Sequence, residues 1–284
     1  MEKEKSTNSL ANNSLVRKKK DANPLSEGRI RELELSITNQ CNLNCRGCGF
    51  NIPNQVVPVN GEGIDEHIKS LRLLKSCGIK IDKIVIAGGE ASLSKKLGDY
   101  LIEIRKIGIS EQIELVTNGL YPRGITKDAL VDIDSFVISD YVMTEEFENI
   151  WRQYIKSLNY KGNVEFRRKT AWDDLLSEVY NDPELTREHW STCFYRKYDV
   201  TLERGRLFSC SRIAKKKWDG QGLLINSETS VSDVSRYLTA EEPRKACYSC
   251  ATIGNESNIP VAEQTRDNFV KIILKAEQYM RENL

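Results

Sequence analysis

The sequence predicts an α/β protein in which parallel strands form a partial (β/α) barrel, followed by a small C-terminal domain of a β-hairpin and helices. From residue 30 onward, short apolar runs alternate with amphipathic segments, which is the pattern of βα units around a parallel sheet. After residue 192 this pattern gives way to a hairpin and closely spaced cysteines. The expected parts are a flexible tail over 1–29, the partial barrel over 30–192, the small domain over 193–255 and a C-terminal helix over 256–284.

The elements of the barrel follow from periodicity. Ile64, Ile68, Leu71 and Leu74 recur at helical spacing, and Gly78 ends the helix that they define. Apolar, β-branched runs between such segments indicate buried strands. The expected strands are 31–38, 83–89, 112–117, 135–139 and 163–169, and the expected helices are 64–77, 93–107 and 145–158.

Composition and charge exclude several function classes. The 284 residues include 42 Lys and Arg against 41 Asp and Glu, so a net charge of +1 provides no field that favours nucleic acid or an anionic membrane. No apolar run approaches the roughly 20 residues that cross a bilayer, and no apolar signal segment follows the first methionine. We therefore expect a cytoplasmic protein without disulfides, which has no nucleic-acid or membrane partner.

In a parallel barrel the ligand site lies at the carboxyl ends of the strands. Glycines there admit a ligand where a Cβ would exclude it, and a carboxylate can accept hydrogen bonds from an ammonium group. The alternative is that such residues form only turns and strand-end caps. The candidates are Gly88, Gly89 and Glu90 after the second expected strand, Thr117 and Asn118 at the end of the third, and Ser139 at the end of the fourth.

The fifth expected strand has two distinct faces. Alternation places Val164 and Phe166 on one face, toward the helices, and Glu165 and Arg167 on the other, toward the cavity. A guanidinium is suited to bidentate binding of a carboxylate, so Arg167 is a candidate carboxylate ligand and Glu165 a candidate catalytic base. A salt bridge between the two is an equally good prediction.

Three cysteines follow the first expected strand as a CxxxCxxC triad: Cys41, Cys45 and Cys48. Three thiolates cannot complete a structural tetrahedral zinc site, which needs four ligands. They can hold three irons of a cubane cluster and leave the fourth iron open. An open iron is where one-electron chemistry on a sulfonium cofactor can begin.

On these cysteines the chain resembles the radical S-adenosylmethionine (SAM) enzymes, which implies a partial barrel of the radical SAM type. The resemblance implies a 4Fe-4S cluster that binds SAM, an electron donor such as reduced flavodoxin or ferredoxin, and cleavage of SAM to a 5′-deoxyadenosyl radical that takes hydrogen from the substrate. It also implies that Gly88, Gly89 and Glu90 bind the methionyl amine. Thr117, Asn118 and Ser139 would contact the sugar and methionyl parts of SAM, and Arg167 its carboxylate.

The chain departs from this family at Gly47. The family commonly has an aromatic residue just before its third cysteine, near the adenine. The adenine contact must therefore come from elsewhere, and Phe50 is the expected candidate.

A second cysteine set lies beyond the barrel. The segment 198–210 has the pattern of a β-hairpin that turns at Arg204-Gly205, and a CxxC follows later. This layout resembles the Twitch domain, a shortened SPASM domain, and is similar in size and spacing to 2-deoxy-scyllo-inosamine dehydrogenase. The resemblance implies one auxiliary 4Fe-4S cluster in which protein ligands bind every iron. The alternative interpretation of the same cysteines is a structural zinc site. The expected ligands are Cys193, Cys210, Cys247 and Cys250.

A fully ligated auxiliary cluster implies electron transfer, and therefore oxidation of a sugar, aminocyclitol or other small hydroxylated metabolite. Modification of a ribosomally made peptide and non-catalytic iron-sulfur or zinc binding are the alternatives. Cys77 ends a helix at the far side of the barrel, so we expect a structural thiol, and His67 and His189 are expected to be structural or surface groups. Apolar spacing over 259–283 predicts an amphipathic helix that packs on the rest of the protein.

Overall fold

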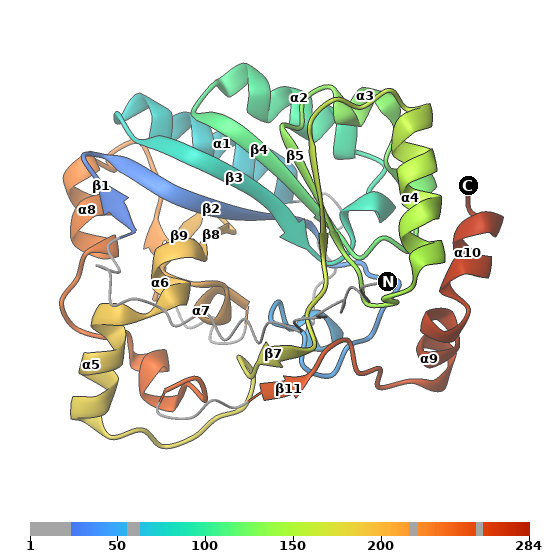
Figure 1. Ribbon diagram of the computed structural model, residues 1–284. Coiled ribbons are helices and arrows are strands. Elements are labelled where there is room, and N and C mark those ends of the chain that lie inside the picture. The colour runs from blue at the N-terminus through green and yellow to red at the C-terminus, as the bar shows by residue number, and fades with distance from the viewer. Residues whose placement is uncertain (1–23, 56–62, 216–220, 254–257) are drawn as a thin grey trace, which may run out of the picture.

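The computed structural model describes residues 24–55, 63–215, 221–253 and 258–284 (Figure 1). One nine-stranded sheet organises these residues, in the order β10-β9-β8-β2-β3-β4-β5-β6, with β1 beside β2. From β8 to β6 all neighbours are parallel, as expected for βα units. The parallel strands are β2 (Arg29–Thr38), β3 (Lys80–Gly88), β4 (Ser110–Thr117), β5 (Ser135–Ser139), β6 (Asn163–Arg167) and β8 (Val200–Glu203).

The remaining strands of this sheet are antiparallel: β1 (Leu25–Ser26), β9 (Arg206–Phe208) and β10 (Leu223–Leu224). β8 and β9 form the predicted hairpin, and its turn residues Arg204 and Gly205 have φ of 49° and 67°. Positive φ at both positions is the geometry that two-residue hairpin turns prefer. Because β8 also pairs with β2, the hairpin that precedes Cys210 continues the sheet of the barrel.

Helices cover both sides of the curved sheet (Figure 1). On the outer side, Leu71 and Leu74 of α1 join Leu33, Leu35 and Ile37 of β2 in the core, because alternate strand residues face the same side. α6 and α7 lie on the inner side. The helices up to α8 are α1 (Gly63–Ser76), α2 (Leu97–Ile107), α3 (Lys127–Leu130), α4 (Glu145–Ser157), α5 (Pro183–Thr192), α6 (Phe194–Tyr198), α7 (Ser211–Lys215) and α8 (Val231–Leu238).

The helix expected over 93–107 begins later than predicted. A separate 3-10 turn, η2 (Ala91–Leu93), comes first, and α2 starts at Leu97. The carboxylate of Glu90 accepts a hydrogen bond from Ser92 N at 3.1 Å, which closes that turn on its own. The other 3-10 turns are η1 (Ile52–Asn54), η3 (Pro122–Gly124) and η4 (Lys245–Ser249).

The single helix expected over 259–283 is wrong. The segment instead begins with β11 (Asn258–Pro260), which pairs antiparallel with β7 (Ala171–Asp173) in a separate two-stranded sheet. Two helices follow, α9 (Asp267–Leu274) and α10 (Ala276–Glu282), with a break at Lys275, whose φ and ψ are −121° and 30°. Pairing with a strand almost ninety residues earlier overrides the local helical pattern. As expected, the segment packs on the barrel, through α10 against α4.

Candidate functional site

The triad cysteines lie on one loop directly after β2, at the carboxyl end of the parallel strands. Cys48 N donates to Cys45 O at 3.4 Å, and Leu43 N donates to Cys41 Sγ at 3.4 Å. Cys45 is buried, whereas Cys41 and Cys48 are half-buried. The loop therefore gathers three thiols at the position where a barrel of this kind binds its ligand.

Burial determines how readily these thiols ionise. Burial raises the pKa of Cys41 and Cys48 and raises the pKa of Cys45 to about 12, so none of them ionises readily without a cation. A bound iron cluster provides that positive charge and displaces the protons. Within the described residues, no three His, Cys, Asp or Glu side chains have the spacing of ligands to one metal ion. Thiolates around a cubane lie further apart than this, because each binds a different iron.

Glu90 joins the ends of β3 and β4, and the structure thereby brings three predicted site residues together. Its carboxylate is completely buried. Oε1 accepts from Thr117 Oγ1 at 2.5 Å and Oε2 accepts from Asn118 N at 2.6 Å. With Ser92 N, these donors hold the carboxylate between the ends of β3 and β4. Burial raises the pKa of Glu90, and these hydrogen bonds lower it in part.

Asn118 links this carboxylate to the triad. Its side-chain Nδ2 donates to Asn42 Oδ1 at 2.6 Å and lies 3.7 Å from Cys41 Sγ. The predicted amine-binding segment and the predicted iron ligands are therefore parts of one connected site.

Internal packing explains both glycines of the Gly-Gly-Glu segment. A Cβ on Gly89 would lie 2.1 Å from Gln40 O, in the loop that leads to the triad. Gly88 has φ of 111°, and a Cβ there would lie 2.9 Å from Ser36 Cβ. Glu90 N also donates to Gln40 O at 2.7 Å. Gly88 therefore allows a close approach to β2, and Gly89 allows one to the loop that leads to the triad.

Sequence reasoning missed Tyr141. It follows the end of β5 by two residues, its hydroxyl bonds Ser139, and burial together with the three triad cysteines raises its pKa. Its ring meets Trp172 of β7 edge-on, with centroids 5.6 Å apart. The available signal was an aromatic residue directly beyond a strand end that was already a candidate.

Arg167 and Glu165 bond each other, which is the salt bridge that the sequence left open. Arg167 Nε lies 3.1 Å from Glu165 Oε1, and the two side chains are 36% and 49% exposed. The opposite face behaves as predicted, because the ring of Phe166 packs under the guanidinium of Arg152 on α4.

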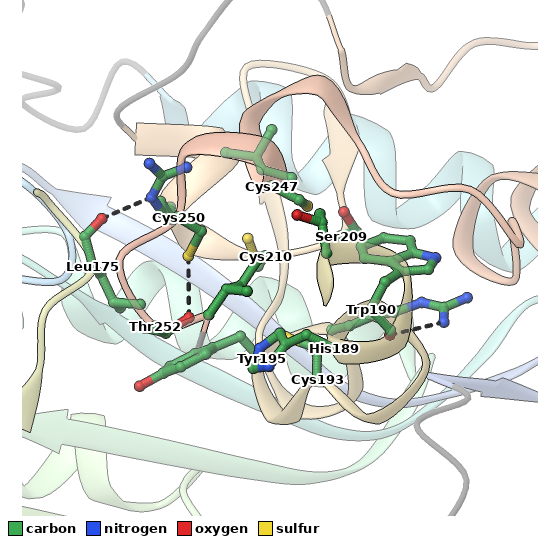
Figure 2. Close-up of a pocket in the computed structure, with 15 residues that line it drawn as sticks. Leu175, His189, Trp190, Cys193, Tyr195, Ser209, Cys210, Cys247, Cys250 and Thr252 are labelled. Atoms are coloured by element: carbon green, nitrogen blue, oxygen red, sulfur yellow. Dashed lines mark hydrogen bonds between the residues drawn. The ribbon is translucent and has the colours of Figure 1, made fainter. Parts of the chain in front are cut away.

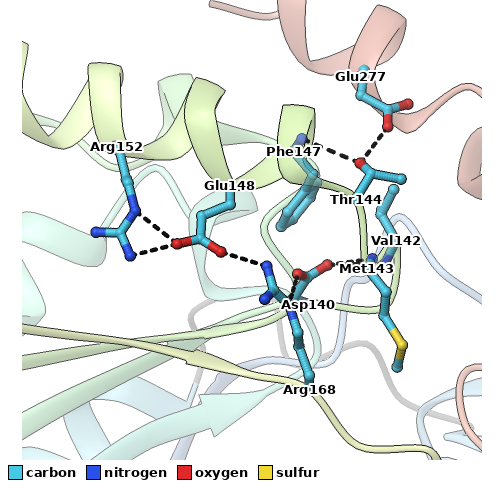
Figure 3. A network of polar contacts seen from close by, with 9 residues as sticks. All are labelled: Asp140, Val142, Met143, Thr144, Phe147, Glu148, Arg152, Arg168 and Glu277. Carbon is cyan, nitrogen blue, oxygen red and sulfur yellow. Dashed lines mark hydrogen bonds and ion pairs between the residues drawn. The ribbon is translucent and has the colours of Figure 1, made fainter. Parts of the chain in front are cut away.

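Arg168, which had no predicted role, anchors the loop after β5 (Figure 3). It donates to the buried Asp140 at 2.7 Å and also binds Glu148 of α4. Asp140 Oδ1 in turn accepts from the backbone N of Val142 and Met143. This network holds the loop that contains Tyr141.

The four later cysteines line one pocket (Figure 2). Cys193 lies between α5 and α6, Cys210 precedes α7, Cys247 lies in η4 and Cys250 directly follows it. Burial raises the pKa of Cys210, raises that of Cys193 to about 11 and raises that of Cys247 to about 12. The structure therefore brings the four predicted ligands of the auxiliary cluster to one pocket.

Two buried side chains shape this pocket by binding backbone carbonyls. Arg212, which is 3% exposed, donates to Leu175 O, Ala246 O and Ser249 O at 2.7–3.0 Å. Asn181 Nδ2 donates to Cys247 O at 3.3 Å and to Cys250 O at 2.8 Å. Both donors keep the CxxC turn opposite Cys193 and Cys210.

The remaining thiol and the two histidines differ in position. Cys77 donates to Leu74 O at 3.2 Å at the end of α1, and His67 is buried with Nδ1 2.9 Å from Tyr100 Oη, so both are structural as expected. His189, in contrast, lines the pocket of the four cysteines. The residues around His189 in the sequence did not predict that it would line this pocket.

Comparison with known families identifies the first part of the site. Residues 35–139 match the model of the Radical SAM superfamily. The protein therefore contains a radical SAM domain, which runs from β2 to the end of β5. A domain of this kind implies a SAM-binding 4Fe-4S cluster, and the triad and the Glu90 network lie within the matched residues.

Curated relatives match only part of the chain. Molybdenum cofactor biosynthesis protein 1 of Drosophila melanogaster is 25% identical over 54% of this chain and 28% of its own length. A probable GTP 3′,8-cyclase of Methanococcus aeolicus is 37% identical over 34% of this chain and 32% of its own length. The chain thus spans about a third of these relatives. A crystal structure of BtrN with AdoMet and 2-DOIA covers 89% of both chains, with 12% identity and a TM-score of 0.41. No helix within the described ranges is long and apolar enough to cross a membrane.

Proposed function

We propose that the protein is a radical SAM oxidoreductase of the dehydrogenase type, which oxidises a small hydroxylated metabolite such as a sugar or an aminocyclitol in the cytoplasm. One observation supports this proposal above all others. Besides the triad of the radical SAM domain, the protein has a pocket that is lined by four further cysteines. Four protein ligands leave no iron open for substrate, so a cluster in this pocket is suited to electron transfer.

The triad site and the pocket of the four later cysteines would have different roles. When bound, the triad cluster and SAM would supply a radical that takes a hydrogen atom from the substrate, and a second cluster would accept the remaining electron. Cys41, Cys45 and Cys48 would hold the first cluster. Glu90, which the ends of β3 and β4 hold in place, would orient the methionyl amine.

A proton must also leave the alcohol for the oxidation to balance at two electrons. Glu165 is the proposed acceptor, and its partner Arg167 is the proposed ligand of the SAM carboxylate. For Arg167 to bind SAM it must exchange its 3.1 Å contact with Glu165 for the ligand, and this exchange would free Glu165 to take the proton. Reduced flavodoxin or ferredoxin is the proposed donor of the initiating electron.

Anaerobic reconstitution with iron, sulfide and SAM tests the proposal. Two 4Fe-4S clusters require about eight irons per chain, and dithionite should then release 5′-deoxyadenosine. A content of about four irons and one zinc per chain would instead indicate a structural zinc site in place of the auxiliary cluster. Absence of 5′-deoxyadenosine from fully loaded protein would favour binding without catalysis.

Cysteine 77 provides a matched control for these measurements. The variant Cys77→Ser should keep the full iron content, because this thiol bonds only the end of its own helix. A loss of about four irons in this variant would contradict the assignment of ligands.

A further inference from the structure

The segment 258–265, here called the C-terminal strap, crosses the triad loop. Arg46 N donates to Glu263 O at 2.8 Å, and Thr265 N donates to Asn44 O at 3.1 Å. These bonds flank an antiparallel bridge between Cys45 and Gln264. The loop that holds the three thiols is therefore paired with backbone about 220 residues further along the chain.

The strap also fills the place beside the third cysteine. A Cβ on Gly47 would lie 2.0 Å from Ile259 Cδ1, so a side chain at position 47 and the strap cannot occupy this space together. Ile259 lies opposite Trp172 in the β7–β11 pair, and Trp172 meets Tyr141. An apolar group from the strap thus stands where an aromatic residue at position 47 would be.

Within the strap, the amide of Gln264 is aimed at the sulfur of Cys45. Gln264 Oε1 accepts from Asn44 N at 2.8 Å, and this bond determines which end of the amide is oxygen. Gln264 Nε2 therefore points the other way, where it lies 3.1 Å from Cys45 Sγ and 2.5 Å from Ala262 O. An amide nitrogen has two hydrogens, so it can donate to both atoms.

This contact is shorter than the other side-chain amide contact to a triad sulfur. The corresponding contact to Cys41, from Asn118 Nδ2, measures 3.7 Å. Cys45 is also only 7% exposed, so water does not compete strongly for its sulfur. In such surroundings the local dielectric constant is low, so a hydrogen bond interacts more strongly with the charge of the sulfur than it would in water.

We infer that Gln264 is a positioning residue that raises the reduction potential of the triad cluster by donating its side-chain N–H to the sulfur of Cys45. This inference rests on the proposed function, because it requires a cluster on the triad. Reduction adds negative charge to a cluster and its thiolates, so a donor to sulfur stabilises the reduced form more than the oxidised form. Removal of the donor should make the cluster harder to reduce.

A redox titration of the reconstituted full-length protein, followed by electron paramagnetic resonance, tests this inference without substrate. Only a cluster with an open iron binds SAM, so the signal that changes on addition of SAM reports the triad. For Gln264→Leu we expect the equilibrium constant for reduction of this cluster to fall about tenfold, which is ~59 mV for one electron. Gln264→Glu, which keeps the acceptor for Asn44 N but places a carboxylate oxygen near the sulfur, should lower it at least as much.

Gln278→Leu is the matched control, because Gln278 is exposed on α10 and bonds only Glu282 in the same helix. Its potential should equal that of the wild type. An unchanged potential in Gln264→Leu at full iron content would overturn the inference. So would loss of the triad cluster from both Gln264 variants in a folded chain, because Gln264 would then serve only to hold the loop. Neither result depends on SAM cleavage, whose absence would instead count against the proposed function.

Discussion

The two cysteine sites differ in how the chain assembles them. The triad occupies eight consecutive residues on one loop, whereas the auxiliary cysteines come from segments that span 193–250 and from different helices. The triad loop is closed by local hydrogen bonds and covered by the strap. The auxiliary pocket depends instead on Arg212, which binds three carbonyls from two separate segments. A binding site can thus be local in sequence or exist only in the folded chain, even when both use the same ligand type.

The largest expected effects separate the functions of the two sites. Cys45→Ala should reduce 5′-deoxyadenosine formation more than 100-fold, because the two remaining thiolates are too few to hold the SAM-binding cluster. Cys250→Ala should keep SAM cleavage but lose product formation from the substrate. Chromatographic assay of 5′-deoxyadenosine, with iron content measured on each variant, checks both. Equal loss of SAM cleavage in the two variants would mean that the sites do not act separately.

The auxiliary pocket should be the more sensitive of the two sites to loss of one buried side chain. Arg212→Met leaves three buried carbonyls without their donor, so we expect a loss of about 3–5 kcal/mol in the free energy of unfolding. Arg187→Met is the control, because Arg187 and Glu242 are 53% and 71% exposed, and its effect should stay within about 0.5 kcal/mol. Urea unfolding of the metal-free proteins measures both values. Similar values for the two variants would contradict the role given to Arg212.

The triad region should instead be sensitive to added volume. Gly89→Ala places a methyl group against the backbone oxygen of Gln40, which cannot rotate away, and should cost about 1–3 kcal/mol of stability. Gly98→Ala, in α2, has nothing within 4 Å of the new Cβ and should be neutral or stabilising by up to about 1 kcal/mol. The same urea titrations compare the two alanines. If Gly89→Ala is as stable as Gly98→Ala, the loop and β3 are not packed as described.

The smallest expected effect is a difference in pH dependence. Burial raises the pKa of Glu90 in the folded protein, so the folded state binds the proton more tightly than the unfolded state does. The stability that this proton provides is present at low pH and is lost as pH rises through the folded pKa.

Comparison of the wild type with Glu90→Gln between pH 4.5 and 8 measures this contribution. The stability of the wild type relative to the variant should fall as pH rises. A pH-independent difference for Glu90→Gln would show that this carboxyl has the same pKa in both states.

Much of the barrel was predictable because its signals are local. The strands and the helices of residues 64–77 and 145–158 agree with the structure within a few residues, since apolar periodicity reflects which face each element buries. The Gly-Gly-Glu and Thr-Asn segments were placed at one edge because parallel strands end together. The hydrogen bonds from Thr117 and Asn118 to Glu90 confirm that they meet.

Other predictions from the sequence failed where a distant segment of the chain determines the structure around a residue. The C-terminal helix starts later than predicted because β11 pairs with β7, and local propensity contains no information on such a partner. The choice between a ligand and a salt bridge for Arg167 was equally open, because both need the same charge on the same face. Tyr141 and His189 were missed because neither lies in a recognisable motif.

The sequence by itself determined the parallel α/β architecture, the hairpin before Cys210 and the three thiols at the end of β2. These depend on spacing within a few residues, where covalent geometry limits what the chain can do. Only the tertiary structure decided that four later cysteines share a pocket and that the strap covers Gly47 and donates to Cys45. Such contacts join residues up to about 220 positions apart, and they form only when the whole fold has brought those segments together.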